Sequence, residues 1–143
     1  MKADVQIRNL DELKEWVQSW AANLPHQQLI LLSGNPGAGK TQLVQFLVEI
    51  LGGTGVSSPT FALQHRYITA RGEVAHFDLY RVESEEELET TGLWDAFGLE
   101  KGWIIVEWPD LIEGLAAPEG WGVMGIRFRV LENGDRQITL TRP

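Results

Sequence analysis

The spacing of apolar residues changes several times along the chain, and each change predicts a different element of secondary structure. Near the N-terminus, apolar residues recur at intervals of three and four, the spacing of one face of a helix. Asn9 precedes this segment and Glu12 follows three residues later, a pattern typical of a helix that starts with a capping box. We expect the two tryptophans of this face to pack on a sheet rather than to form a docking surface. The face comprises Leu13, Trp16, Val17, Trp20 and Ala21.

Two continuous apolar runs predict the central strands. Such runs are typical of parallel strands that are buried on both faces, and here they predict strands at 29–33 and 103–107. A glycine-rich loop and a second helical pattern follow the first run. That helix is expected over residues 40–51, because Gly52 and Gly53 then end it.

Alternation of apolar and polar residues predicts two hairpins. Residues 61–67 and 73–81 are expected to pair as antiparallel strands around a turn at residues 71–72. A second hairpin is expected near the C-terminus, where two alternating segments flank Asn133 and Gly134. This dipeptide is a strong signal for a two-residue turn.

One further short helix, capped by Ser84, is expected to end near Gly92. Strand–loop–helix units combined with hairpins predict a three-layer α/β domain with a mixed, mainly parallel central sheet and added antiparallel hairpins. A chain of 143 residues suits a single domain over residues 1–143.

Composition excludes several classes of protein. Without cysteine, the chain forms no disulfides or thiolate metal sites, and its three histidines show no metal-ligand spacing. No apolar run approaches the roughly 20 residues of a membrane span, and no signal peptide is visible, so we expect a cytoplasmic protein. The net charge of −8 argues against direct binding to nucleic acid, which needs basic surface. The only local basic cluster is Arg127 with Arg129, so any link to nucleic acid is expected to run through a partner.

One loop has the pattern of a phosphate-binding site. Residues 34–41, GNPGAGKT, match G-x-x-x-x-G-K-[ST] and lie between an expected strand and an expected helix, the context of a P-loop. In a P-loop, backbone N–H groups and the helix N-terminus surround the phosphates of ATP. Lys40 is expected to reach the β- and γ-phosphates, and Thr41 to bind Mg²⁺. The predicted nucleotide-binding residues of this segment are Asn35, Pro36, Gly37, Ala38, Gly39, Lys40, Thr41 and Gln42.

P-loop proteins also need an acidic residue at the end of a neighbouring strand, to hold Mg²⁺ or its water and to orient the attacking water. Glu107 follows four apolar residues and Asp78 ends a more polar strand, so both are candidates for catalytic and metal-binding roles. The alternatives are a salt-bridged strand end for Glu107 and a helix or turn cap for Asp78. Trp108, beside Glu107, is expected to close the site or contact a partner; packing in the core is its alternative.

The reaction class follows partly from what the sequence lacks. It has no N-K-x-D motif of a GTPase, and its DAFG segment at 95–98 follows a helical stretch rather than a strand. A small-molecule kinase usually has a lid that carries arginines, and no inserted helical segment is present to form one. Hydrolysis of ATP that regulates a partner protein fits best. A small-molecule kinase and a nucleotide-binding module without turnover are the alternatives.

Five motifs together resemble the bacterial TsaE (YjeE) family. GNPGAGKT, VSSPTFAL, HFDLYR, EEL followed by GL, and IIVEWPD occur in the order and spacing of that family, from about residue 8 to the C-terminus. The resemblance implies a small Mg²⁺-dependent ATPase, weak on its own, of tRNA threonylcarbamoyladenosine biosynthesis. Its implied partner is a TsaB–TsaD heterodimer, in which TsaD modifies adenosine 37 of tRNA. ATP hydrolysis is implied to reset that complex between turnovers.

The resemblance also implies roles for single residues. Residues 58–60 would form a switch-like loop near the γ-phosphate, with Thr60 as its polar tip. Asp78 and Glu107 would be the acidic pair around metal and water. The family's loop commonly reads GDLGAGKT, so residues 35–36 depart from the family while the Gly-Lys-Thr sequence is intact.

Overall fold

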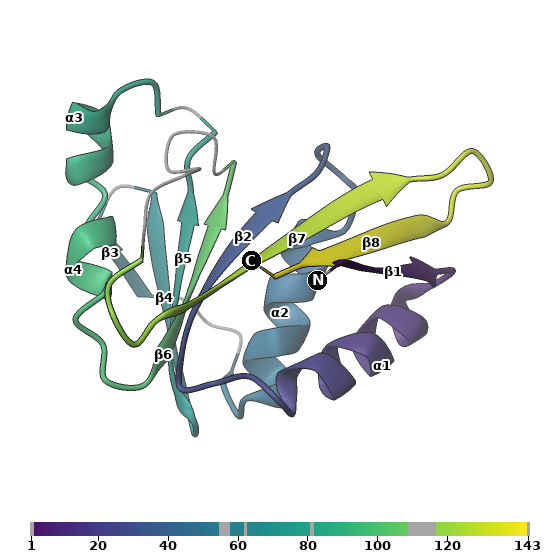
Figure 1. Ribbon diagram of the computed structural model, residues 1–143, viewed down its shortest axis with the longest axis horizontal. Coiled ribbons are helices and arrows are strands. Elements are labelled where there is room, and N and C mark those ends of the chain that lie inside the picture. Colours follow the sequence, from purple (N-terminus) through teal and green to yellow (C-terminus); the bar gives the residue numbers. More distant parts are fainter. Residues whose placement is uncertain (1, 55–57, 62, 81, 109–116, 143) are drawn as a thin grey trace.

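The computed structural model describes residues 2–54, 58–61, 63–80, 82–108 and 117–142. Its strands are β1 (Lys2–Ile7), β2 (Gln27–Ser33), β3 (Ser58–Phe61), β4 (Gln64–Thr69), β5 (Gly72–Asp78), β6 (Gly102–Glu107), β7 (Gly122–Val130) and β8 (Arg136–Thr141). Its helices are α1 (Leu10–Ala21), α2 (Lys40–Ile50), α3 (Glu85–Glu89) and α4 (Leu93–Ala96). The eight strands of this described part form one sheet in the order β1-β8-β7-β2-β6-β5-β4-β3 (Figure 1).

The centre of the sheet is parallel and both of its sides are antiparallel. Strands β7, β2, β6 and β5 run in one direction. Strands β8 and β1 add antiparallel pairings on one side, and β4 and β3 add them on the other. The expected mixed α/β fold is confirmed, but the prediction that the sheet is mainly parallel is wrong. Three of its seven described strand pairings are parallel and four are antiparallel, because parallel pairing is confined to the centre. One strand of the C-terminal hairpin, β7, is part of this parallel centre, because the long connection from β6 allows it to pair in parallel with β2.

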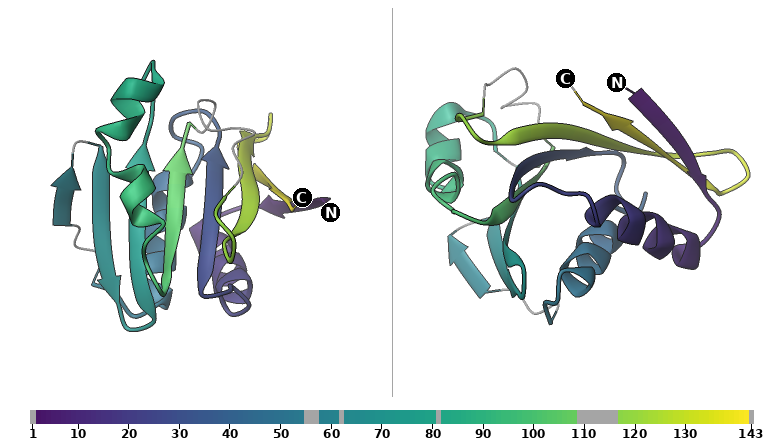
Figure 2. Two further views of the ribbon diagram at one scale, coloured as in Figure 1. Left: turned by 60° about the vertical axis from the view of Figure 1, so that its left-hand side comes forward. Right: turned by 60° about the horizontal axis from the view of Figure 1, so that its bottom comes forward.

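Two hydrophobic clusters lie on opposite faces of the sheet. Successive residues of a strand point to opposite faces, and along β2 Ile30 and Leu32 belong to one cluster while Leu29 belongs to the other. Helices α1 and α2 contribute to the first cluster, and α3 and α4 to the second (Figure 2). On α1, Trp20 is buried and Trp16 stacks on it with ring centroids 5.4 Å apart, so the expected packing on the sheet is confirmed.

The capping signals predicted helix starts correctly. Asn9 caps α1, and its side-chain oxygen accepts the N–H of Glu12 at 2.9 Å. The carboxylate of Glu12 accepts the N–H of Arg8 at 2.8 Å instead of the N–H of Asn9. Ser84 caps α3 through the N–H of Glu87 at 3.2 Å. Among the described residues, no helix is long and apolar enough to cross a membrane.

The segment expected as one strand over residues 61–67 is divided between β3 and β4. Between these strands, Leu63 has a φ of 66°, which interrupts extended backbone. The backbone of β3 pairs with β4 at the edge of the sheet, so the prediction of a loop at 58–60 is wrong. Pro59 is compatible with this position, because an edge strand has one side on which no N–H donor is needed.

The C-terminal hairpin forms as expected, but its turn is longer than two residues. Residues 131–135 connect β7 to β8. Gly134 has a φ of 89°, and the side-chain oxygen of Asn133 accepts the N–H of Asp135 at 3.0 Å. The side-chain hydrogen bond of Asn133 supports a wider turn than the dipeptide alone predicts.

Candidate functional site

The loop of residues 34–41 connects β2 to α2 and packs against β7. Gly34 and Gly39 have φ angles of 141° and 121°. Residues that carry a Cβ atom are strained in this conformation, whereas glycine is not. A Cβ atom on Gly34 would lie 2.7 Å from the carbonyl oxygen of Phe128, and one on Gly39 would lie 2.9 Å from the Phe128 ring. Both glycines are therefore required by the close packing of the loop on Phe128.

Arg136, the first residue of β8, anchors the same loop. Its Nε donates to the carbonyl of Ala38 at 3.1 Å and its Nη2 donates to that of Gly37 at 3.4 Å, while Nη1 donates to Gly134. The C=O and N–H groups of one trans peptide point in opposite directions. Anchoring the carbonyl of Ala38 therefore also orients the N–H of Gly39. Arg136 could not be predicted from the sequence, because no local pattern connects it to a loop about a hundred residues away.

Lys40 begins α2, and three groups surround its ammonium group. Only 6% of the residue is exposed. Its Nζ donates to the carbonyl of Gly34 at 2.7 Å, lies 3.8 Å from Oε1 of Glu107, and lies 4.4 Å from the centre of the Trp108 ring. A buried charge needs such compensation. The contacts direct the Lys40 charge toward the end of β6.

Glu107 ends β6 and is also buried, at 7% exposure. Its Oε2 lies 2.6 Å from Nε2 of His76 on the adjacent strand β5. The parallel register pairs Glu107 with Asp78, so Glu107 shares a face of the sheet with Asp78 and with His76 two residues earlier. The three histidines are scattered in the sequence and do not by themselves indicate a site. The signal that points to His76 is the spacing in HFD, which puts it on the same face of β5 as Asp78.

The surroundings of Glu107 lower the pKa of its carboxyl group below the ordinary value. Burial raises this pKa, because it disfavours the charged form. The hydrogen bond and charge of His76, together with the charge of Lys40, lower the pKa by more than burial raises it. Glu107 is therefore a carboxylate at neutral pH, with His76 beside one oxygen and Lys40 nearest the other.

Asp78 lies at the end of β5 and is exposed. Its Oδ1 accepts the N–H of Tyr80 at 3.1 Å, so it caps the turn that follows the strand. It also lines the same cavity as Lys40 and Glu107. Asp78 can therefore cap the turn and also belong to the site, because the hydrogen bond from Tyr80 engages only one of its two carboxylate oxygens.

Trp108 forms a wall of the site and is only partly buried. Its φ of 58° is unusual for a bulky residue and ends the extended backbone of β6. Its ring lies 4.9 Å from the ring of Tyr80, which is 63% exposed. The second hydrophobic cluster supports part of Trp108, and the rest faces Lys40 and the cavity.

A cavity of about 450 Å³ brings most of the predicted site residues together. Of the others, Asn35 lines a neighbouring hollow, and the buried side chain of Ala38 belongs to the core, so only its backbone is available to a ligand. Thr60 belongs to β3, and its side chain lies outside the described part of the structure. The cavity is lined by Pro36, Gly37, Gly39, Lys40, Thr41, Gln42, Asp78, Tyr80, Glu107 and Trp108.

The oxygen-bearing side chains that line this cavity are suitable ligands for Mg²⁺. They are the hydroxyl of Thr41 and the carboxylates of Asp78 and Glu107, and Mg²⁺ prefers oxygen ligands. Among the described residues, no group of three or more His, Cys, Asp or Glu side chains forms a metal site. This set fits the usual way in which Mg²⁺ is bound beside a nucleotide, through one or two carboxylates together with phosphate and water oxygens.

Comparison with known proteins identifies the family. The family model described as threonylcarbamoyl adenosine biosynthesis protein TsaE matches residues 7–138. The chain belongs to the TsaE family. A TsaE protein of Rickettsia prowazekii is 33% identical, over 94% of this chain and 91% of that protein. One from a Synechocystis strain is 38% identical, over 76% of this chain and 71% of that protein. Among solved structures, Bacillus subtilis YdiB matches with a TM-score of 0.72 and 25% identity, over 99% of this chain and 86% of that chain.

Proposed function

We propose that this TsaE-family protein is a Mg²⁺-dependent ATPase, built as a three-layer P-loop domain, that supports formation of threonylcarbamoyladenosine at position 37 of tRNA. It would bind a TsaB–TsaD-type heterodimer in the cytoplasm and reset it through ATP hydrolysis. The observation that carries the proposal is the convergence of Lys40, Thr41, Asp78 and Glu107 on one cavity at the N-terminus of α2. The names of the relatives support the pathway.

The division of tasks follows from the geometry. Lys40 and the N-terminus of α2 present positive charge to the β- and γ-phosphates of ATP. Mg²⁺, held by Thr41 with Asp78 or Glu107, would neutralise charge on the phosphate oxygens. Glu107 is ionised and held in place by His76, so it is suited to orient the attacking water.

The experiment measures release of phosphate from ATP by the isolated protein and by its mixture with the TsaB–TsaD-type pair of the same organism. We expect slow hydrolysis alone and a changed rate in the mixture. Nucleotide binding without turnover in both conditions would favour a binding module. Transfer of the γ-phosphate to an added small acceptor would favour a kinase. Each of these two results contradicts the proposal.

A further inference from the structure

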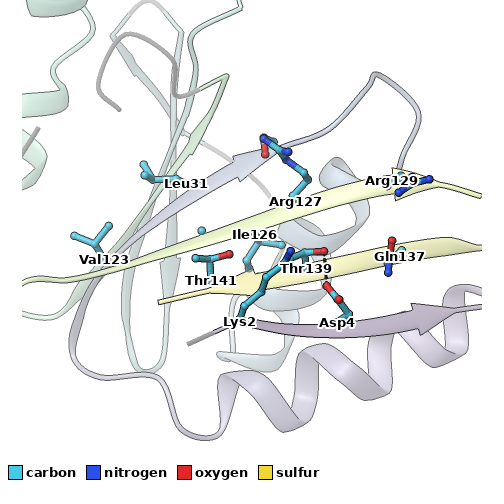
Figure 3. A pocket seen from close by; sticks show the side chains of 12 residues that line it. Lys2, Asp4, Leu31, Val123, Ile126, Arg127, Arg129, Gln137, Thr139 and Thr141 are labelled. Carbon is cyan, nitrogen blue, oxygen red and sulfur yellow. Dashed lines mark hydrogen bonds between the residues drawn. The ribbon is translucent and has the colours of Figure 1, made fainter. Parts of the chain in front are cut away.

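A second, larger concavity lies on one face of β1, β8, β7 and β2. It is separate from the cavity beside Lys40 and Glu107, which we propose to bind ATP and call the nucleotide cavity. It has a volume of about 790 Å³, and Figure 3 shows the side chains of its four strands around it. Apart from Ile126, which belongs to the first hydrophobic cluster, the lining residues of β2 and β7 point away from α1 and α2. We call this surface the sheet groove. It is lined by Lys2, Asp4, Leu31, Ser33, Val123, Gly125, Ile126, Arg127, Arg129, Gln137, Thr139 and Thr141.

The sheet groove is basic although the protein is acidic. Three cations and one carboxylate line it, whereas the chain as a whole carries a net charge of −8. Asp4 accepts a hydrogen bond from the hydroxyl of Thr139 at 2.7 Å (Figure 3). Within the described residues, Arg127 and Arg129 form no ion pair and are exposed. Their charges are therefore available to an external anionic group.

The shape of the groove favours a macromolecule over a small ligand. Lys2, Arg127 and Arg129 are exposed side chains around an open surface, whereas pockets for small molecules bury most of the ligand. Leu31 and Val123 provide a partly buried apolar floor. An apolar centre with a charged rim is typical of protein–protein interfaces.

The groove continues toward the nucleotide cavity. Ser33, Arg127 and Arg129 also line a second hollow of about 510 Å³, to which Asn35 and Trp108 contribute. Trp108 in turn lines the nucleotide cavity. A ligand in the sheet groove that extends past Arg129 and Arg127 therefore reaches Trp108, a wall of the nucleotide cavity.

We infer that the sheet groove binds an acidic segment of the partner protein and that Trp108 lies between this segment and the nucleotide. The inference rests on the proposed function, since it names the surface that the TsaB–TsaD-type pair contacts. Charge complementarity selects an acidic segment. The overall charge of −8 argues against RNA as the occupant, because a nucleic acid would be repelled by the rest of the surface.

The test is a titration of the labelled protein with the TsaB–TsaD-type pair, with ATP and Mg²⁺ present. The double variant Arg127→Glu/Arg129→Glu should bind the pair at least roughly tenfold more weakly, and Arg127→Gln/Arg129→Gln should show an intermediate loss. The matched control is Arg71→Glu/Lys101→Glu, which changes the charge equally at two exposed positions outside the groove. It should bind like the wild type. All variants should retain affinity for an ATP analogue.

A glutamate-rich peptide and a single-stranded RNA of similar length serve as probes. The wild type should bind the peptide in preference to the RNA and lose it on charge reversal at positions 127 and 129. Equal partner binding by the two Glu double variants would overturn the inference while leaving the proposed function intact. RNA binding that is stronger than peptide binding and is lost on charge reversal would also overturn it. Failure of the wild type to bind the pair would overturn the proposed function together with the inference.

Discussion

At the scale of single residues, the site depends on two buried charges of opposite sign. Lys40 and Glu107 are each less than a tenth exposed, and Nζ of Lys40 lies 3.8 Å from Oε1 of Glu107. Removing one partner of a buried pair leaves the other poorly compensated. Substitutions here therefore affect both function and stability, and the two effects must be measured separately.

Lys40→Ala should greatly weaken ATP binding. A charge-assisted contact to phosphate contributes about 1.5–3 kcal/mol, so the dissociation constant should rise roughly 10- to 150-fold. Isothermal titration with a non-hydrolysable ATP analogue measures this, with Lys101→Ala, an exposed lysine, as the control. Unchanged affinity and unchanged turnover would contradict the P-loop assignment.

Glu107→Gln should reduce turnover much more than affinity for ATP. The amide keeps the shape of Glu107 but loses the charge that would orient water in the transition state. Asp78→Asn should instead raise the Mg²⁺ concentration needed for activity, because Asp78 is exposed at the cavity and suited to the metal. Steady-state kinetics across a Mg²⁺ series separate the two. Small, equal effects would show that neither acid belongs to the catalytic site.

Glu107 should also make stability depend on pH. Its folded-state pKa is lowered below the ordinary value of 4.5. The stabilisation from its ionised form is therefore present above about pH 4.5 and is lost as the pH falls through the lower folded-state pKa. Urea unfolding should show Glu107→Gln to be less stable than the wild type at pH 7, with a difference that shrinks at strongly acidic pH. A difference that does not depend on pH would contradict this role.

At the scale of elements, the loop of residues 34–41 is held in place by β8 as well as by its connection to α2. Arg136 donates to two loop carbonyls. Arg136→Ala should weaken binding of the ATP analogue about fivefold, because a net loss of about 1 kcal/mol is typical when hydrogen bonds of this kind are removed. Arg136→Lys should restore little, since lysine lacks the planar fork of donors. Arg71→Ala, at an exposed turn on the opposite end of the sheet, is the control.

The elements that could be predicted are those with strong local signals. Asn9 and Ser84 marked helix starts, and the apolar runs around Ile30 and Ile105 marked the parallel centre. Strand β1 was missed because only Ile7 of its six residues is buried, so it lacks an apolar pattern and depends on pairing with β8. Helix α4 was missed because four residues are too few to show helical spacing.

The same distinction applies to the site. The loop and the acids at the ends of β5 and β6 could be predicted, because each lies beside a recognisable strand. His76 and Arg136 could not, because their partners, Glu107 and Ala38, are distant in sequence. The register of β5 on β6 brings His76 to Glu107, and the packing of the loop beside β7 and β8 brings Arg136 to Ala38. Local pattern therefore located the parts of the site that touch the cavity, while the contacts that hold them in place required the fold.

At the scale of the whole molecule, charge is distributed unevenly. The overall charge is −8, yet the sheet groove carries three cations and a single carboxylate among its lining residues. Long-range attraction follows the net charge, whereas short-range contacts follow the local arrangement. This protein should therefore repel a long polyanion while still accepting a short acidic segment in the groove.

From this balance we predict weak or undetectable binding of tRNA by the isolated protein near physiological salt. Few cations are available to release counterions from an RNA backbone, and over the whole chain 20 acidic residues outnumber 12 basic ones. Labelled tRNA is titrated with the protein alone and with its TsaB–TsaD-type partner, each with and without ATP and Mg²⁺. We expect tRNA binding only when the partner is present, and partner binding that depends on nucleotide because Trp108 borders both the nucleotide cavity and the hollow next to the groove. Tight, steeply salt-dependent binding of tRNA by the lone protein would contradict the charge argument. Partner binding that is indifferent to nucleotide would remove Trp108 as the link between the two sites.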